Sequence, residues 1–162
     1  MLHVSVHSRG RAVVVLIAVV AIVGALWRSA GTAGAQGDIH VVLQTDGGRT
    51  TFLDFGATGL RLGDRLAARG LLLDATQTDQ VGVANLDCVV HRRIAGGTGG
   101  VYRCSYLLRL PDGDLVMEGF DPHGPGVSVF AVLGGTETYA SAAGSATLTD
   151  TESETDIVID LI

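Results

Sequence analysis

Short runs of β-forming residues, separated by turns rich in glycine, proline and aspartate, constrain the fold of this chain more than any other feature. Between residues 38 and 162 about nine such runs occur, at 38–45, 49–55, 64–74, 81–93, 101–110, 115–121, 127–133, 144–151 and 155–162. Their spacing of roughly 8–12 residues is typical of an all-β sandwich or barrel. Residues 134–143 show no periodicity and are expected to hold at most one helical turn. We therefore predict an all-β domain.

Two of these runs indicate how the sheet closes. In the last run Ile157, Ile159 and Leu161 alternate with Asp156, Val158 and Asp160, which is the pattern of a strand with one buried face. Residues 127–133, by contrast, are apolar on nearly both faces, and such a strand needs cover on both sides of the sheet. A closed barrel that packs against a sister subunit would supply that cover.

The N-terminal residues resemble an export signal. Arg9 and Arg11 precede an apolar run over residues 12–26, and small residues ending in Ala33-Gly34-Ala35 follow it. These are the parts of a secretory signal peptide, so we expect cleavage after Ala35 and a secreted, extracellular domain at 36–162. The alternative is an uncleaved anchor at 1–35 with the domain facing outside. That alternative requires a span of about 20 apolar residues, and the run is shorter.

The two cysteines lie in the predicted exported domain, where disulfides persist. Residues 81–93 and 101–110 are expected to form a hairpin, and the midpoint between Cys88 and Cys104 falls in the glycine-rich loop between them. A simple hairpin therefore places the two cysteines opposite each other, and we predict a disulfide. The alternative of a redox pair or a metal site lacks the CxxC spacing, and no histidine stands at metal-ligand spacing, so no metal is expected.

The balance of charges narrows the possible functions. All 11 basic residues are arginines, against 17 Asp+Glu, which gives a net charge of −6. Removal of residues 1–35 would take away three of these arginines and no acid, leaving 8 − 17 = −9. An acidic domain is poorly suited to nucleic acid, and the absence of lysine excludes a P-loop phosphate site and Schiff-base chemistry. We expect no cofactor and no nucleic-acid partner.

Several segments, taken in order, resemble a known family. They are residues 51–56 and 62–64, Val81-Gly82, Cys88, Cys104, 110–113, Gly119, 130–136, Tyr139 and 142–144. Together they resemble the bacterial allene-oxide-cyclase-like barrels, which are relatives of the plant dirigent proteins. The resemblance covers about residues 50–162, and its specificity comes from the order and spacing of the pieces.

The resemblance implies a barrel of eight antiparallel strands, assembled as a trimer, with a cavity for a small hydrophobic molecule. The plant cyclases fold an allene oxide toward one ring closure, and dirigent proteins steer the coupling of two phenoxy radicals. Both act mainly by orienting reactants. This chain lacks the adjacent aspartates of plant dirigent proteins and the Asn-x-Leu-Tyr stretch of the plant cyclases, so neither substrate follows from the resemblance.

Two aspartates are candidates for the cavity. Asp54 falls where the plant cyclases carry an acidic residue, so it is the candidate catalytic group, a carboxylate whose pKa an apolar cavity would raise. Its alternative role is that of a strand-end aspartate bonded to the turn at Gly56. Asp64 is matched in both branches of the family and is a candidate ligand-binding residue, with turn capping as the alternative.

Asn85 and Arg103 are the other candidate ligand-binding residues. Asn85 and Asp87 lie on the strand face opposite Cys88, and Arg103 and Ser105 share the corresponding face of the return strand. If that face lines the cavity, the cluster would orient a polar end of the ligand, and if it faces water it is ordinary surface. Alternation alone does not distinguish the inner face from the outer one.

Three functions agree with these observations. The first is a secreted, dirigent-like protein that binds a small hydrophobic molecule and steers its coupling or cyclisation. The second is a true isomerase or cyclase without a cofactor, in which Asp54 polarises the substrate. The third is a structural or interaction module whose barrel interior is filled.

Overall fold

The computed structural model describes residues 37–45, 50–56, 59–94, 99–122 and 124–162. Within these residues the chain forms nine β-strands and one short 3-10 turn, η1 (Glu137–Tyr139). The strands are β1 (Gly37–Thr45), β2 (Thr51–Leu53), β3 (Arg65–Asp74), β4 (Gln80–Arg93), β5 (Gly100–Leu110), β6 (Gly113–Asp121), β7 (Gly126–Gly135), β8 (Gly144–Asp150) and β9 (Thr155–Leu161). The expected signal peptide and its cleavage site lie outside the described residues. The described part of the chain contains no helix with the length and hydropathy needed to cross a membrane.

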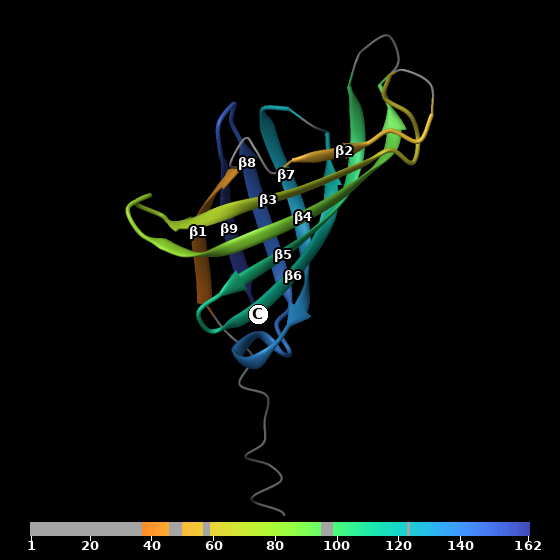
Figure 1. The fold of residues 1–162 in the computed structure, drawn as a ribbon. Helices are drawn as coiled ribbons and strands as arrows, with labels where there is room; N and C mark the ends of the chain where they lie inside the picture. Colours follow the sequence, from red (N-terminus) through yellow and green to blue (C-terminus); the bar gives the residue numbers. More distant parts are fainter. Residues whose placement is uncertain (1–36, 46–49, 57–58, 95–98, 123) are drawn as a thin grey trace, which may run out of the picture. The chain divides into compact units, whose positions relative to one another are not determined.

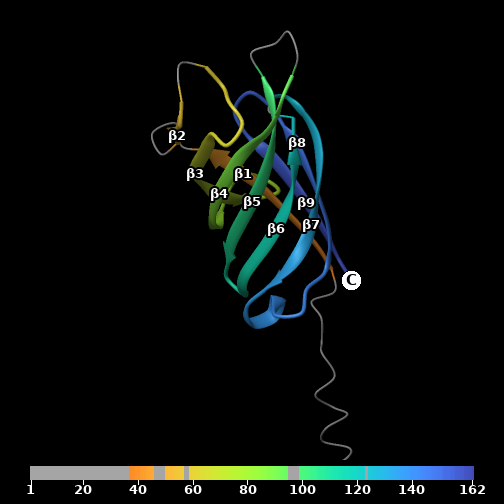
Figure 2. The same cartoon turned by 90° about the vertical axis from the view of Figure 1, so that its right-hand side faces the viewer.

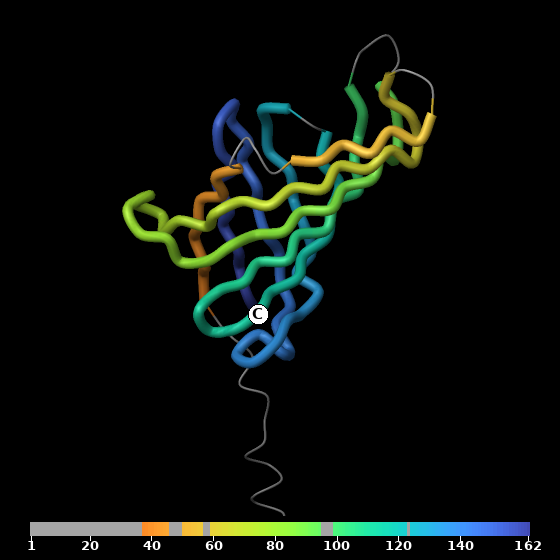
Figure 3. Tube along the Cα trace, viewed as in Figure 1, coloured from red at the N-terminus to blue at the C-terminus, as the bar shows by residue number. Residues whose placement is uncertain are grey.

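The strands form a closed antiparallel barrel, as the sequence predicts. Neighbouring strands follow the order β1-β9-β8-β7-β6-β5-β4-β3, and β1 also pairs with β3, which closes the sheet into eight strands (Figures 1 and 2). The short β2 pairs with the first residues of β3 and extends the sheet beside them (Figure 3). β1 and β2 therefore lie one after the other along the same edge of β3, and both are antiparallel to it.

The barrel interior is packed with apolar side chains from alternate positions of the strands. Leu72, Leu108, Leu115, Met117, Ala146, Ile157 and Ile159 are all 0% exposed. The alternation predicted for the last strand is confirmed, because Ile157, Ile159 and Leu161 point inward. Burial of each large aliphatic side chain contributes about 1.5–3 kcal/mol, so this layer supplies much of the stability of the barrel.

The strand β7 has two apolar faces with different surroundings. Ser128, Phe130 and Val132 are buried inside the barrel. On the outer face Val127 and Val129 are each 64% exposed and Leu133 is 58% exposed. The barrel interior thus covers the inner face of this strand, as predicted, and the outer apolar face is exposed to solvent in the single chain.

The predicted disulfide is present on the inner face of the sheet. Cys88 of β4 and Cys104 of β5 are direct partners in the strand register. Their Cα atoms are 4.0 Å apart, the sulfur atoms are bonded at 2.05 Å, and both residues are buried. Because Cys88 and Cys104 lie on the inner face, the residues that alternate with them along β4 and β5 lie on the outer face.

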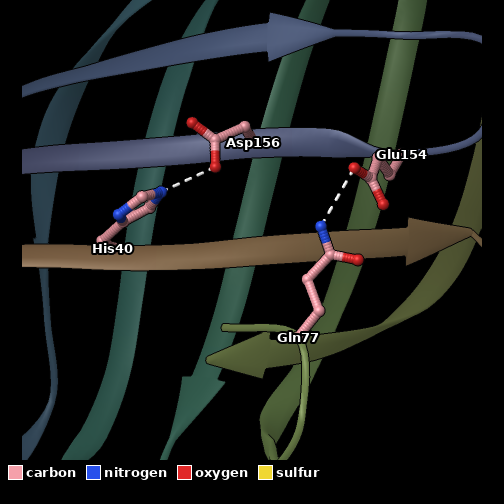
Figure 4. A network of polar contacts seen from close by, with 4 residues as sticks. All are labelled: His40, Gln77, Glu154 and Asp156. Carbon is pink, nitrogen blue, oxygen red and sulfur yellow. Dashed lines mark hydrogen bonds and ion pairs between the residues drawn. The ribbon is translucent and has the colours of Figure 1, made fainter. Parts of the chain in front are cut away.

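A set of polar contacts joins neighbouring strands and turns on the outside of the barrel (Figure 4). His40 of β1 places Nε2 at 2.7 Å from Oδ1 of Asp156 on β9. The Gln77 amide, in the turn between β3 and β4, donates to Oε1 of Glu154 at 3.1 Å, just before β9. These exposed contacts support the seam where β1 connects β9 to β3.

Candidate functional site

A cavity of about 240 Å³ lies at the end of the barrel where β1, β6 and β8 end and β3, β5 and β9 begin. We call it the mouth cavity. Its apolar wall comes from Leu43, Leu66, Ala68, Leu86 and the Cys88 disulfide. Its polar wall includes four threonines, two tyrosines and two aspartates, namely Thr45, Thr50, Thr151, Thr155, Tyr102, Tyr106, Asp121 and Asp150. Apolar side chains and polar groups that converge on one concave site are features of small-molecule sites.

The two tyrosines come from β5, on the same face as Cys104. Tyr102 is 5% exposed and Tyr106 is 2% exposed. The Tyr106 ring meets the Phe130 ring edge-on, with centroids 5.2 Å apart and planes at 88°. Gly119, opposite Phe130 on β6, leaves room for that ring, because a Cβ at this position would lie 2.7 Å from it. The absence of a side chain at Gly119 thus helps to set the position of the Tyr106 ring.

Burial and nearby negative charges raise the pKa of both phenols. Burial raises the pKa of Tyr106, and the negative charges of Asp121 and Asp150 raise this pKa further. Burial also raises the pKa of Tyr102, with smaller contributions from Asp121 and Asp64. Both side chains therefore stay protonated at physiological pH and present O–H donors.

The two aspartates lie at the last residues of their strands, on the rim of the cavity. Asp121 ends β6 and Asp150 ends β8. Thr155 is the first residue of β9. Its hydroxyl donates to Oδ1 of Asp150 at 2.5 Å and so helps to hold that carboxylate in place. Phenol donors and carboxylate acceptors on one wall can orient the polar end of a small molecule whose apolar part contacts the leucines.

Asp54 lies outside the mouth cavity. It follows β2, is exposed, and its Oδ1 accepts a hydrogen bond from the Gly56 N–H at 2.9 Å. This is the contact that the alternative interpretation, a strand-end aspartate bonded to the turn, expects. The described residues that line the cavity do not include Asp54, and a catalytic role for it stays a prediction.

Asp64 is completely buried and organises the segment before β3. Its Oδ1 accepts from the Phe55 N–H at 3.1 Å, and its Oδ2 accepts from the Arg61 N–H at 2.7 Å. Its backbone carbonyl accepts from the Val90 N–H at 2.8 Å, which connects this segment to β4. These contacts are those of a turn-organising residue, and a contact between Asp64 and a ligand stays a prediction.

Asn85 and Arg103 lie on the outer face of the barrel, because Cys88 and Cys104 occupy the inner one. Arg103 pairs with Glu118 of β6, and Arg65 of β3 pairs with Asp87. Arg103 and Asp87 line an outer groove of about 440 Å³, together with His91, Ser105 and Glu118, whereas Asn85 does not. The polar cluster could line the cavity or face water, and the structure places it on the outside of the barrel.

The polar residues that do line the mouth cavity differ from those singled out in the sequence. The signal for Tyr102 and Tyr106 is their alternation with Cys104, which places all three on one face. Asp121 and Asp150 precede turns, where aspartate is common for reasons of local backbone hydrogen bonding, so the sequence carries no distinct signal for them. The described residues contain no group of three or more His, Cys, Asp or Glu side chains arranged to hold a metal.

Comparison with solved structures identifies proteins that share this fold. No family model matches the chain, and no curated protein matches it by sequence. Solved structures match over most of its length, and they include dirigent proteins and cyclase or Diels-Alderase barrels. The chain therefore has the fold shared by these proteins, in agreement with the resemblance that the sequence shows.

Three of these structures illustrate the range. A pyocyanin demethylase matches with a TM-score of 0.67 and 22% identity, over 78% of this chain and 100% of that protein. The Diels Alderase AbmU from Streptomyces koyangensis matches with a TM-score of 0.60 and 16% identity, over 78% of this chain and 64% of that protein. The pterocarpan synthase dirigent protein PsPTS1 matches with a TM-score of 0.57 and 16% identity, over 77% and 94% of the two chains.

Proposed function

We propose that this barrel binds a small, largely apolar molecule in the mouth cavity and steers its coupling or cyclisation. The observation that carries the proposal is the cavity itself, which combines a leucine wall with phenol and carboxylate groups at an end of an otherwise filled barrel. The fold neighbours support it, since their names include dirigent proteins and Diels-Alderases. A structural module with a filled interior would have no such cavity.

The physical basis of steering is confinement. A cavity that holds a flexible or reactive molecule in one geometry converts a disordered encounter into a near-attack arrangement and lowers the entropic part of the barrier. The rigid barrel wall and the packed layer below the cavity suit this role, because they resist deformation when the ligand binds. No covalent step by the protein is needed.

A true cyclase or isomerase is the second candidate. The observation in its favour is that titratable groups line the cavity, namely Tyr102, Tyr106, Asp121 and Asp150. In that case a carboxylate or phenol would move a proton during ring closure. The steering protein and the enzyme differ in one measurement, because only the enzyme loses turnover when Asp121→Asn or Asp150→Asn leaves ligand binding intact.

The proposal also covers where the protein works and how it assembles. The protein is exported by residues 1–35 and works outside the cytoplasm, where its disulfide is stable.

The protein assembles as a trimer through the outer face of β7, where Val127, Val129 and Leu133 are exposed, and Phe120 of the neighbouring β6 is 52% exposed. Several large apolar side chains exposed on neighbouring strands are typical of an interface.

Native mass spectrometry tests the proposal directly. The full chain is expressed in an exporting bacterial host, collected outside the cytoplasm, and examined for a displaceable small-molecule adduct. It is then challenged with panels of fatty acids, phenols and polycyclic aromatics. An adduct that is displaced by one chemical class supports the proposal, and a bare protein that takes up no compound overturns it.

A pair of variants on one strand links binding to the mouth cavity. Ala68 of β3 lines the cavity, while its neighbour Ala67 is exposed on the opposite face. Ala68→Phe should fill the cavity and abolish the adduct, and Ala67→Phe should leave it unchanged. Equal binding by both variants would show that the ligand occupies a different site.

A further inference from the structure

Tyr106 places a hydroxyl group at the mouth cavity that the rest of the described structure does not use. The residue is 2% exposed and lines the cavity. No residue in the described part of the chain shares a hydrogen bond with this hydroxyl, and no described side-chain oxygen is both fully buried and without a partner. The Tyr106 hydroxyl is therefore open to the cavity and free to bind what enters it.

The position of this hydroxyl is fixed before any ligand binds. The Tyr106 ring is held edge-on by Phe130, which in turn occupies the space above Gly119. The strand partners of Tyr106 are Leu86 of β4 and Met117 of β6, so its backbone lies in the centre of the sheet. A donor held in this way loses little conformational entropy when it forms a hydrogen bond.

The chemistry of the surrounding groups makes the hydroxyl a donor. Burial and the charges of Asp121 and Asp150 raise the pKa of the phenol, so it stays protonated, and no described residue accepts a hydrogen bond from it. The same two carboxylates disfavour an anionic ligand, because like charges repel at close range in a medium of low dielectric constant. The acceptor that suits this position is therefore an oxygen without a full negative charge.

We propose that Tyr106 donates a hydrogen bond to a carbonyl oxygen of the ligand, so that the ligand is an apolar molecule carrying a ketone or quinone group. This inference rests on the proposed function, because it names the polar group of the molecule that the mouth cavity binds. A site built around a buried donor discriminates against analogues that lack the acceptor, since the donor would then stay unpaired.

Two aromatic probes of the same shape test the inference. 2-Acetylnaphthalene carries a ketone, and 2-isopropenylnaphthalene has a methylene group in place of the oxygen. Their dissociation constants are measured by fluorescence titration against the full-length protein, Tyr106→Phe and Tyr139→Phe. Tyr139 is the matched control, because it is also a buried tyrosine but lies on η1, away from the cavity.

The expected result is that the protein prefers the ketone and that this preference depends on the hydroxyl oxygen of Tyr106. The wild-type protein and Tyr139→Phe should bind the ketone about five-fold more tightly than the alkene, which corresponds to one neutral hydrogen bond. Tyr106→Phe should bind both probes equally. Its unfolding midpoint should match that of the wild type, because the hydroxyl has no hydrogen-bond partner among the described residues.

The carbonyl stretching band gives a readout that a purely structural role would not change. With ¹³C at the carbonyl of bound 2-acetylnaphthalene, the band should lie at lower frequency in the wild type than in Tyr106→Phe. An unchanged band, or a ketone preference that survives in Tyr106→Phe, overturns the role of Tyr106 and leaves the proposed function standing. Binding of neither probe, together with a bare protein in native mass spectra, overturns both.

Discussion

Asp54 and Asp64 show how two aspartates near each other in the sequence take different roles. The Asp64 carboxylate is fully buried and accepts two backbone N–H groups, whereas Asp54 is exposed and accepts one. A buried carboxylate is stable only where hydrogen bonds replace its hydration, and the Phe55 and Arg61 amides provide them. The Gly-Asp pair predicts a turn residue at Asp64, but its burial depends on β4, which the local sequence does not specify.

This difference predicts unequal effects on stability. Asp64→Ala removes a charged acceptor from two amides and should lower the free energy of unfolding by about 2 kcal/mol. Asp54→Ala, at an exposed position, should lower it by less than about 0.5 kcal/mol. Urea unfolding followed by circular dichroism measures both values. Similar losses in the two variants would contradict the structural role assigned to Asp64.

At the scale of strands and turns, the sequence predicts most of the fold. The runs at 64–74, 81–93 and 144–151 correspond closely to β3, β4 and β8, because turn residues and β-branched runs are local signals. The run at 49–55 is the exception, since among its described residues, 50–55, the strand covers Thr51–Leu53. The strand β2 is short because it pairs with Arg65–Ala67 alone. Pairing between strands is a long-range property that a local pattern does not specify. The predicted turn at 46–48 lies outside the described residues.

The turn between β3 and β4 depends on the ionised form of Asp74. Hydrogen bonds from the Asp79 backbone and then from the Thr76 side chain lower the pKa of Asp74 from 3.8 to about 2. Because the folded-state pKa is lowered, the carboxylate supports the turn above pH 3.8 and loses this role as the pH falls through about 2. A carboxyl titration followed by NMR should give a midpoint near 2. Thr76→Val should move it upward, and Thr149→Val, on β8, should not.

The hairpin of β4 and β5 is expected to depend on its disulfide. Cys88 and Cys104 are 16 residues apart, and a crosslink of that length restricts the unfolded chain by about 3 kcal/mol. The double variant Cys88→Ala/Cys104→Ala should therefore lose about this much free energy of unfolding. Chemical denaturation of the two proteins at the same pH gives the comparison. A loss below about 1 kcal/mol would show that the crosslink adds little to the hairpin.

At the scale of the whole molecule, closure of the sheet decides which residues meet. Alternation places Tyr106 with Cys104, and Arg103 on the opposite face, but it does not say which face is inside. The pairing of β1 with β3 resolves this, because it encloses the tyrosine face and leaves Arg103 in the outer groove. Asp121 and Asp150 reach the same cavity from strands far apart in the sequence. The mouth cavity is thus a product of long-range pairing, and local patterns could not predict its polar wall.

The open outer face of β7 leads to the last prediction, which concerns assembly. Val129 is 64% exposed at the centre of this face, and Leu71 of β3 is 41% exposed on the other side of the barrel, four strands away. If three copies pack through β7, Val129→Glu places unpaired charges in the interface, which is costly because the charge must be desolvated. Sedimentation velocity should then give a trimer for the wild type and for Leu71→Glu, and a monomer for Val129→Glu. A wild-type monomer at micromolar concentration would show that this face does not bind another copy of the chain.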